Sequence, residues 1–150
     1  MSIKETLQKD LTEAIRGRNE ITSGTIRMVL TAITNEELAG KEARVLSDEE
    51  VITVLSREAK KRREAAEAFE SAGRADKSAL EKSEGEVIAK YLPAQLSEAD
   101  IAAIIAEAIA STGAQGPADM GKVMGAVKPK IAGKADGGVV SALVKAALNK

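Results

Sequence analysis

The sequence contains no cysteine and no histidine in 150 residues. Without cysteine, the chain can form no disulfide and no thiolate metal site, and it has no thiolate nucleophile. Without histidine, it lacks the commonest general base and the commonest metal ligand. Any chemistry would have to rest on carboxylates, lysines, hydroxyl groups or the single tyrosine. We therefore expect no catalytic residues, no metal and no cofactor.

Aromatic residues are almost absent, because Phe69 and Tyr91 are the only two, although 44% of the residues are hydrophobic. The core must be built from Ala, Ile, Leu and Val, which suits closely packed helices better than a sandwich of sheets. No apolar run approaches the roughly 20 residues that span a bilayer. The first 13 residues also lack the basic stretch and apolar block of a signal peptide. We expect a cytoplasmic monomer with no membrane partner.

Charge is balanced overall but unevenly distributed. The formal net charge is −1, and residues 1–92 hold 16 basic and 18 acidic side chains. Residues 115–150 instead hold six lysines against two aspartates. A local basic surface can bind phosphate groups even on a slightly acidic protein. The C-terminal third is therefore the part of the chain most suited to a polyanion.

Apolar residues recur at helical spacing along the whole chain. Residues 47–50 and 97–100 each read as a helix N-terminal capping signal. Glycines at positions such as 17, 73 and 113 mark the ends of helices. The pattern predicts helices over approximately residues 3–16, 22–40, 48–72, 74–92, 98–112, 120–132 and 139–148.

Pro93 marks the clearest boundary, because a proline disfavours the helical conformation at the residue before it. The three short helices predicted beyond it can close a small core of their own. We therefore expect an all-α protein with an N-terminal helical domain at residues 1–93 and a small three-helix tail domain at residues 94–150. No internal repeat is visible.

The helix predicted after residue 120 has an unusual distribution of residues. Its apolar residues gather on one side, and Gly121 and Gly125 lie on the opposite side with Lys122. A glycine inside a helix costs about 1 kcal/mol relative to alanine, so two on one face need an explanation. The missing side chains allow close backbone approach. The approaching group is either another helix of the same protein or an RNA.

Three further lysines surround the glycine-containing turn after this helix: Lys128, Lys130 and Lys134, with Gly133 between the last two. Lysines near a helix C-terminus commonly complement the helix dipole. Lysines around a glycine-rich turn also suit contacts with phosphates, which contribute affinity without reading base sequence. Both interpretations are open at this stage.

Other motifs predict no separate function. Residues 116–122 fit seven positions of a phosphate-binding P-loop, but Val123 replaces the required Ser or Thr and no strand precedes the motif. The basic run at residues 57–63 is typical of a solvated helix face with ion pairs between neighbouring turns. The acidic residues at positions 76–86 lack the aromatic platforms of a glycosidase.

A family resemblance is carried by three segments. Residues 118–136, with the helix at 139–148, resemble the tail domain of the B subunit of the tRNA-dependent amidotransferase. The run at residues 69–96, with its Gly73-Arg74-Ala75-Asp76 step and its Tyr91-Leu92-Pro93 step, resembles the N-terminal domain of the free-standing GatB/YqeY family. The resemblance covers essentially the whole chain. It departs from the family pattern at Ala75 and Lys77-Ser78, where an Asp-Leu pair would be expected.

The resemblance implies a non-catalytic protein that binds tRNA or another structured RNA, alone or with amidotransferase subunits. Neither the kinase-like cradle nor the Ser-Ser-Lys amidase of the parent enzyme has a counterpart in this chain. Two alternatives are an adaptor that docks a partner helix on the glycine face and an accessory to a carbon–nitrogen ligase using glutamine as amide donor. The resemblance implies that the following residues contact RNA: Lys122, Lys128, Lys130, Lys134, Gly121, Gly125 and Gly133.

Overall fold

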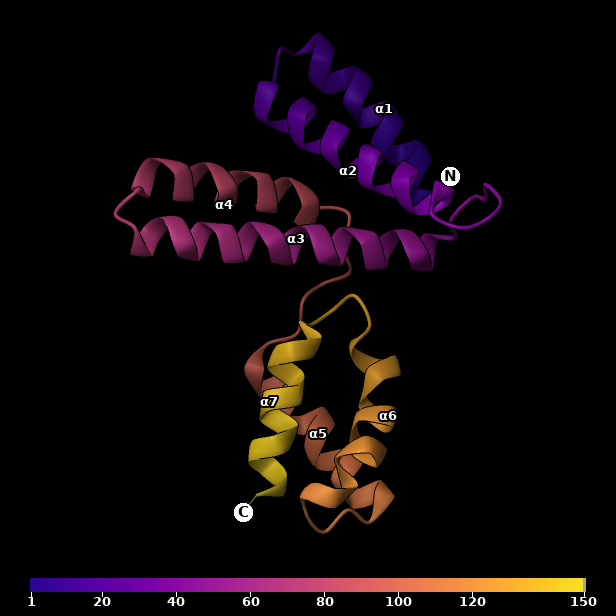
Figure 1. Cartoon of the computed structure of the whole chain (residues 1–150), viewed down its shortest axis with the longest axis vertical. Helices are drawn as coiled ribbons and strands as arrows, with labels where there is room; N and C mark the ends of the chain where they lie inside the picture. Colours follow the sequence, from indigo (N-terminus) through magenta and orange to yellow (C-terminus); the bar gives the residue numbers. More distant parts are fainter. Residues whose placement is uncertain (150) are drawn as a thin grey trace. The chain divides into compact units, whose positions relative to one another are not determined.

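The computed structural model describes residues 1–149 and contains no strand in that range (Figure 1). The all-α class is therefore confirmed. The described elements are α1 (Ile3–Arg16), α2 (Glu20–Leu38), α3 (Asp48–Ser71), α4 (Ala75–Ala89), α5 (Glu98–Thr112), the short 3-10 helix η1 (Pro117–Asp119), α6 (Met120–Ile131) and α7 (Gly137–Leu148).

The chain separates into two compact units, Met1–Leu92 and Pro93–Lys150. The N-terminal unit contains α1 to α4, and the C-terminal unit contains α5, η1, α6 and α7. Each unit has its own cluster of buried apolar residues. The protein therefore has two hydrophobic cores, each built almost wholly from aliphatic side chains.

Serine side chains start three of the helices. The Ser47 hydroxyl accepts a hydrogen bond from the Glu50 amide at 3.2 Å, and the Glu50 carboxylate accepts one in return from the Ser47 amide. Ser97 and Asp100 form the same reciprocal box at the start of α5. Both capping signals predicted from the sequence are confirmed. The box satisfies two backbone donors that the first turn of a helix leaves without partners.

The N-terminal unit consists of two helical hairpins, one of α1 with α2 and one of α3 with α4 (Figure 1). Large aliphatic side chains from all four helices are fully buried, among them Leu7, Ile33, Leu55 and Ile88. The Tyr91 hydroxyl donates a hydrogen bond to Asp10 at 2.5 Å, which ties the segment after α4 to α1. Burial, helped by this carboxylate, raises the pKa of Tyr91.

The helix predicted to end at Leu92 ends three residues earlier, at Ala89. The amides of Tyr91 and Leu92 donate to the carbonyls three residues before them, at 3.0 and 3.2 Å. This tighter hydrogen bonding is common where an α-helix ends. Pro93 restricts only the residue before it, so the sequence could not fix the earlier end.

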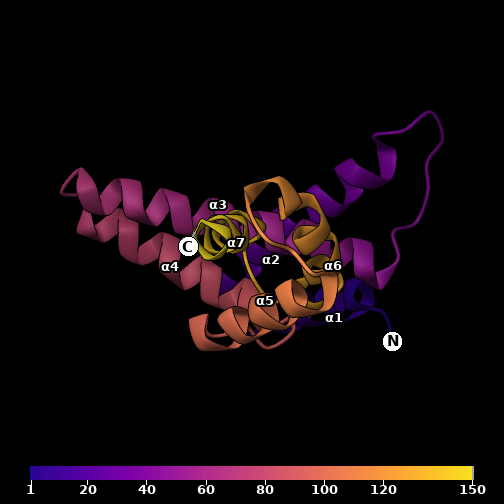
Figure 2. The same cartoon turned by 90° about the horizontal axis from the view of Figure 1, so that it is seen from below.

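The C-terminal unit has a core of small aliphatic residues. Val123, Val127, Val140 and Val144 have no exposed surface, and they pack with isoleucines from α5. Figure 2, which looks nearly along α7, shows α5 and α6 beside it. Within residues 93–149, no polar or charged side chain is buried.

Two residues ahead of α5 hold the start of the C-terminal unit in place. The Leu96 amide donates to the Lys134 carbonyl at 2.9 Å, and the Gln95 side-chain amide donates to the Gly133 carbonyl at 2.9 Å. These bonds place the start of α5 beside the turn that leads into α7. Helices α5 and α7 therefore run in the same direction, and α6 returns between them in the chain.

Candidate nucleic-acid interface

Helix α6 carries five of the seven predicted RNA-binding residues and has two different sides. Val123, Val127 and Ile131, four residues apart, are buried against α5 and α7. The helical repeat turns Gly121 and Gly125 outward, whereas Met124 and Ala126 are partly buried and pack against the core. The apolar pattern is sufficient to fix α6 in its unit, so the opposite side is free for another role.

Gly121 and Gly125 lie on this opposite side and are exposed. A Cβ atom added at either position would meet no atom within 4 Å in the part of the chain that the structure describes. No helix of the C-terminal unit packs against the glycines. Packing on another helix of this unit is therefore excluded as the reason for the two glycines, and contact with RNA stays a prediction.

Lys122 and Lys128 lie on either side of the two glycines. At about 100° of rotation per residue, Gly121 and Gly125 lie between these lysines around the helix axis. The Lys122 side chain is 70% exposed, and its Nζ lies 3.8 Å from Asp119 Oδ1. Such an exposed pair contributes little stability, so Lys122 can exchange Asp119 for a phosphate at small cost. We call Gly121, Lys122, Gly125 and Lys128 the glycine face.

Lys130 lies away from the glycine face. It is about 160° around the helix from Lys128, and its Nζ lies 3.4 Å from Glu107 Oε1 on α5. The four lysines predicted to act together are therefore divided, with Lys122 and Lys128 on the glycine face and Lys130 toward α5. A single flat ligand cannot contact all of α6's lysines equally.

Gly133 and Lys134 form the turn after α6. Gly133 has φ +72°, a left-handed conformation that favours glycine, so ending the helix explains this residue without a ligand. The backbone of Lys134 is held by hydrogen bonds to Ile131 and Leu96, and its side chain is exposed. The turn thus presents one lysine from a fixed backbone.

The first turn of α6 follows η1 rather than a strand. Asp119 precedes the helix, but its side chain caps no backbone amide of α6, and its Oδ2 accepts from the Gln115 amide at 3.0 Å. Residues 116–122 are therefore not arranged as a P-loop. The Met120 amide donates to the Pro117 carbonyl, so η1 leads directly into α6. The helix dipole gives the start of α6 a positive partial charge next to Gly121 and Lys122.

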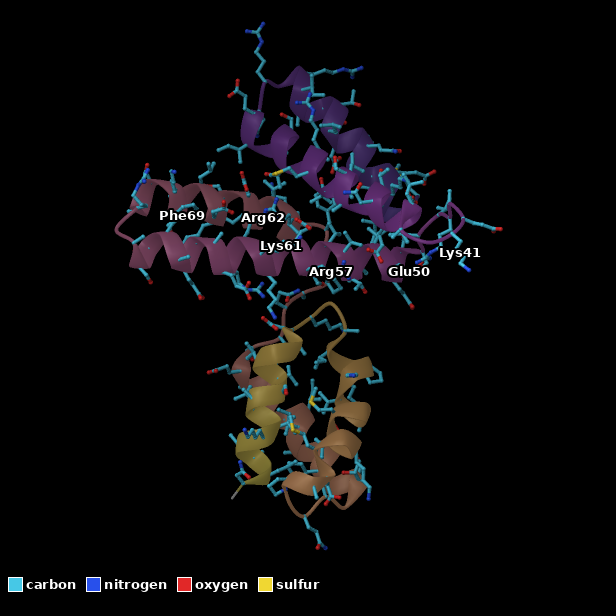
Figure 3. The ribbon with its side chains drawn as sticks, in the orientation of Figure 1. Lys41, Glu50, Arg57, Lys61, Arg62 and Phe69 are labelled. Carbon is cyan, nitrogen blue, oxygen red and sulfur yellow. The ribbon has the colours of Figure 1, made fainter. Side chains whose placement is uncertain are left out.

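The basic run on α3 contains one residue that the sequence analysis placed wrongly. Arg62 is buried and points toward α4 (Figure 3), although we expected the whole run to be a solvated face. Its Nη1 lies 2.6 Å from a Glu58 carboxylate oxygen, and its Nε lies 3.6 Å from Glu84 Oε2 on α4. Arg57 and Lys61 are exposed, as expected. Arg62 therefore stabilises the packing of α3 against α4, and its positive charge is not available to bind a ligand.

The pKa of Glu58 shows which effect dominates in this cluster. Burial alone raises the pKa of this carboxyl, but hydrogen bonds from Lys61 and Arg62 outweigh burial, and the pKa falls below its ordinary value. The sequence did contain a signal for this arrangement. Glu58 follows Leu55 by three residues and Arg62 follows Glu58 by four, which continues the helical stripe of Val51 and Leu55 and places both on the buried side of α3.

Residues 1–149 contain neither a metal-binding cluster nor a membrane-spanning helix. No group of three or more carboxylates converges there in a way that could hold a metal ion. None of the helices in that range combines the length and apolar composition needed to cross a bilayer.

Comparison with known proteins assigns the family. A family model described as Yqey-like protein matches residues 4–148. The chain belongs to the YqeY-like family. This YqeY-like protein also resembles an uncharacterized protein of Schizosaccharomyces pombe, with 29% identity over 97 residues that cover 64% of this chain and 76% of the relative. Membership of this family, which the sequence predicted, is confirmed.

Proposed function

We propose that this YqeY-like protein is a non-catalytic RNA-binding protein that contacts the backbone of a folded RNA such as tRNA. The observation that carries the proposal is the open glycine face, with two exposed lysines beside two glycines that nothing in their unit covers. We place this function in the cytoplasm, with the protein acting as a monomer.

The glycine face suits phosphates for three physical reasons. The missing Cβ atoms let a sugar–phosphate backbone approach the helix backbone closely. Lys122 and Lys128 supply mobile positive charge on both sides of the approach. The positive end of the α6 dipole lies next to Gly121 and favours an anion.

Recognition would depend on RNA shape more than on base sequence. Phe69 and Tyr91 are the only aromatic residues, and both belong to the N-terminal unit, so the C-terminal unit has no ring on which a base could stack. Phosphate contacts carry no base information. A folded RNA, in which phosphates lie at fixed spacings, should therefore bind better than an unstructured RNA of equal length.

The proposal is tested by titrating fluorescent tRNA with the protein at increasing salt. If all four predicted lysines contact phosphates, the logarithm of the affinity should fall with the logarithm of salt with a slope of about −3.6. This slope corresponds to a roughly 100-fold loss of affinity between about 50 and 200 mM salt. Binding that is insensitive to salt would contradict the proposal.

Two double variants divide the lysines as the structure does. Lys122→Ala with Lys128→Ala should lower the affinity and reduce the slope by about two. Lys130→Ala with Lys134→Ala should have the smaller effect, because Lys130 faces α5. Lys145→Ala, an exposed change on α7, is the matched control. If the first double variant binds tRNA as well as the control, the glycine face is not the RNA-binding surface.

The second candidate function is an adaptor that accepts a partner helix on the same face. The open glycines favour it too, since a helix backbone can approach them as closely as RNA can. Gly125→Leu separates the two candidates. Loss of tRNA binding with unchanged circular dichroism supports RNA binding. Unchanged tRNA binding, with loss of a protein that co-purifies with the parent, supports the adaptor.

A further inference from the structure

The only sulfur atoms of this chain belong to its four methionines, because cysteine is absent. A methionine thioether can be oxidised to the sulfoxide, and reductases in cells can reverse this step. Met1 is 84% exposed and Met28 is 41% exposed, whereas Met120 and Met124 are partly buried against the core of the C-terminal unit. Met28 is therefore the helical methionine that an oxidant in solution reaches most easily.

Met28, on α2, also differs from the other methionines in what its sulfur contacts. The Nη2 atom of Arg62, on α3, donates a hydrogen bond to the Met28 sulfur at 3.5 Å. The sulfur of Met1 accepts only from the neutral Thr6 hydroxyl, at 3.4 Å. A thioether sulfur is a weak acceptor. The Met28 sulfur thus gives a charged donor a poor partner.

Arg62 is held in place by other groups, yet its hydrogen bonding is incomplete. Its side chain is only 10% exposed, and its Nη1 donates to Glu58 Oε2 at 2.6 Å. Its Nε is buried and has no hydrogen-bond partner among the residues that the structure describes. Glu84 Oε2 lies 3.6 Å from Nε, too far for a good bond. A buried guanidinium in this state gains from any stronger acceptor that reaches it.

Oxidation of Met28 supplies such an acceptor at the place to which Arg62 donates. The sulfoxide is polar and carries an oxygen where the thioether has none. Hydrogen bonds from a charged donor are roughly twice as strong as neutral ones. The methionine side chain has three rotatable bonds, so it can turn this oxygen toward the guanidinium. A sulfoxide usually disrupts the packing around it, and here a buried cation offsets that loss.

We propose that Met28 is a site of reversible oxidation and that Arg62 binds the oxygen of its sulfoxide. The oxidant is a peroxide. The sulfur attacks one peroxide oxygen, an S–O bond forms, and the O–O bond breaks. With hydrogen peroxide, the released hydroxide takes the proton of the new S–OH group and leaves as water. The sulfur loses the two electrons that the peroxide gains.

The reverse step uses a methionine sulfoxide reductase. Two thiols of the reductase system are oxidised to a disulfide, and the sulfoxide oxygen leaves as water. The oxidation state of Met28 then changes how α2 is held to α3. This site does not depend on RNA binding, because Met28 and Arg62 belong to the N-terminal unit and the glycine face belongs to the other.

The first measurement is the rate of oxidation at each methionine of the full chain in dilute hydrogen peroxide. Trypsin, which cuts after lysine and arginine except before proline, releases residues 1–4, 28–41, 91–122 and 123–130 as separate peptides with one methionine each. Mass spectrometry therefore follows the four sites independently. Met28 should be oxidised faster than Met120 and Met124, and within about 10-fold of the rate of Met1. A methionine sulfoxide reductase should restore the thioether at Met28 in the folded protein.

The second measurement is urea unfolding followed by Tyr91 fluorescence, which reports the unit that contains α2 and α3. Peroxide should raise the urea midpoint of the parent, because Arg62 gains a stronger acceptor. Met28→Leu cannot be oxidised, so peroxide should leave its midpoint unchanged. Met1→Leu is the matched control and should keep the response of the parent. In NMR spectra of the parent, the side-chain signals of Arg62 should shift on oxidation.

Three outcomes overturn the proposal. The first is oxidation at Met28 that is no faster than at Met120 and Met124, or that the reductase does not reverse. The second is a urea midpoint of the parent that peroxide does not raise. The third is a response to peroxide that persists in Met28→Leu, which would assign the effect to another methionine. Unchanged circular dichroism of both variants excludes loss of folding as the cause of any difference.

Discussion

The two units differ in what they bury. In the N-terminal unit, polar and charged side chains lie within the protein, including Arg62, Glu58 and Glu37. In the C-terminal unit, the described residues bury aliphatic side chains only. Charge is thus part of the packing in the first unit and lies on the surface in the second.

This difference suggests a division of roles. Buried ion pairs and hydrogen bonds need good geometry to offset the cost of desolvation, so they favour one arrangement of α3 against α4. An aliphatic core of three short helices makes no such demand on its exposed faces. Those faces can carry glycines on α6 and alanines on α5 without loss of packing. We therefore expect binding to be concentrated in the C-terminal unit.

The largest effect is expected from a variant that disrupts the buried charges of the N-terminal unit. Arg62→Ala leaves Glu58 buried without its closest partner, and it should lower the free energy of unfolding by about 3–5 kcal/mol. Arg57→Ala, on the exposed side of the same helix, should cost less than about 1 kcal/mol. Urea unfolding followed by Tyr91 fluorescence reports this unit alone. Equal costs for the two variants would show that the buried cluster does not stabilise the fold.

A second variant breaks the aliphatic core instead. Ile105→Ala removes a buried side chain from α5 and should cost about 2–5 kcal/mol. The C-terminal unit contains no aromatic residue, so Tyr91 fluorescence reports the N-terminal unit and should show the same urea midpoint as in the parent. Circular dichroism, which reports both units, should show an additional transition at lower urea. Coincident early transitions by both probes would mean that the two units unfold together.

The pH dependence of the N-terminal unit gives a smaller effect. Two hydrogen bonds lower the pKa of Glu37 from its ordinary value of 4.5. The bond from Lys4 has the larger effect, and the bond from the Leu46 amide has the smaller one. A lowered pKa means that ionised Glu37 stabilises the folded state above pH 4.5, and that this contribution is lost as the pH falls through the folded-state pKa. The urea midpoint by Tyr91 fluorescence should therefore fall between about pH 7 and pH 3. Glu37→Gln should reduce the fall, and an unchanged fall would assign it to other groups.

The smallest expected effect concerns the glycines of the C-terminal unit. Gly125→Ala meets open space inside a helix and should stabilise the protein by about 0.5–1 kcal/mol. Gly113→Ala also meets open space, but its φ of +69° should make the change destabilising by about 1–2 kcal/mol. Thermal unfolding by circular dichroism measures both. A destabilising Gly125→Ala would mean that the glycine face is not open.

The sequence predicted most of the fold because local signals were strong. Ser47 and Ser97 mark helix starts through chemistry confined to four residues, and the aliphatic spacing of α6 specifies its buried side. Arg62 was misplaced because a run of basic residues resembles a solvated surface. Its burial depends on α4, where Gly85 leaves room and the Arg62 Cβ lies 3.8 Å from a Cβ built on that glycine.

The candidate site could be predicted only in part. The glycines and lysines of α6 were identified from sequence, but whether Gly121 and Gly125 face a helix or solvent depends on where α5 and α7 pack. The orientation of Lys130 toward Glu107 likewise requires the position of α5. An open apolar groove of about 490 Å³ between α5 and α7 was not predicted either, since alanines suit a helix whether its surface is buried or exposed.

The hydrogen bonds of Gln95 and Leu96 determine where the gene could be divided. A fragment that begins at Pro93 keeps both residues and their bonds to the turn at Gly133 and Lys134. A fragment that begins at Ser97, where the helical signal starts, would leave those two carbonyls without their partners. A protease that cleaves after Leu96 would have the same consequence. The segment after the boundary at Pro93 is therefore part of the structure that holds the turn carrying Lys134.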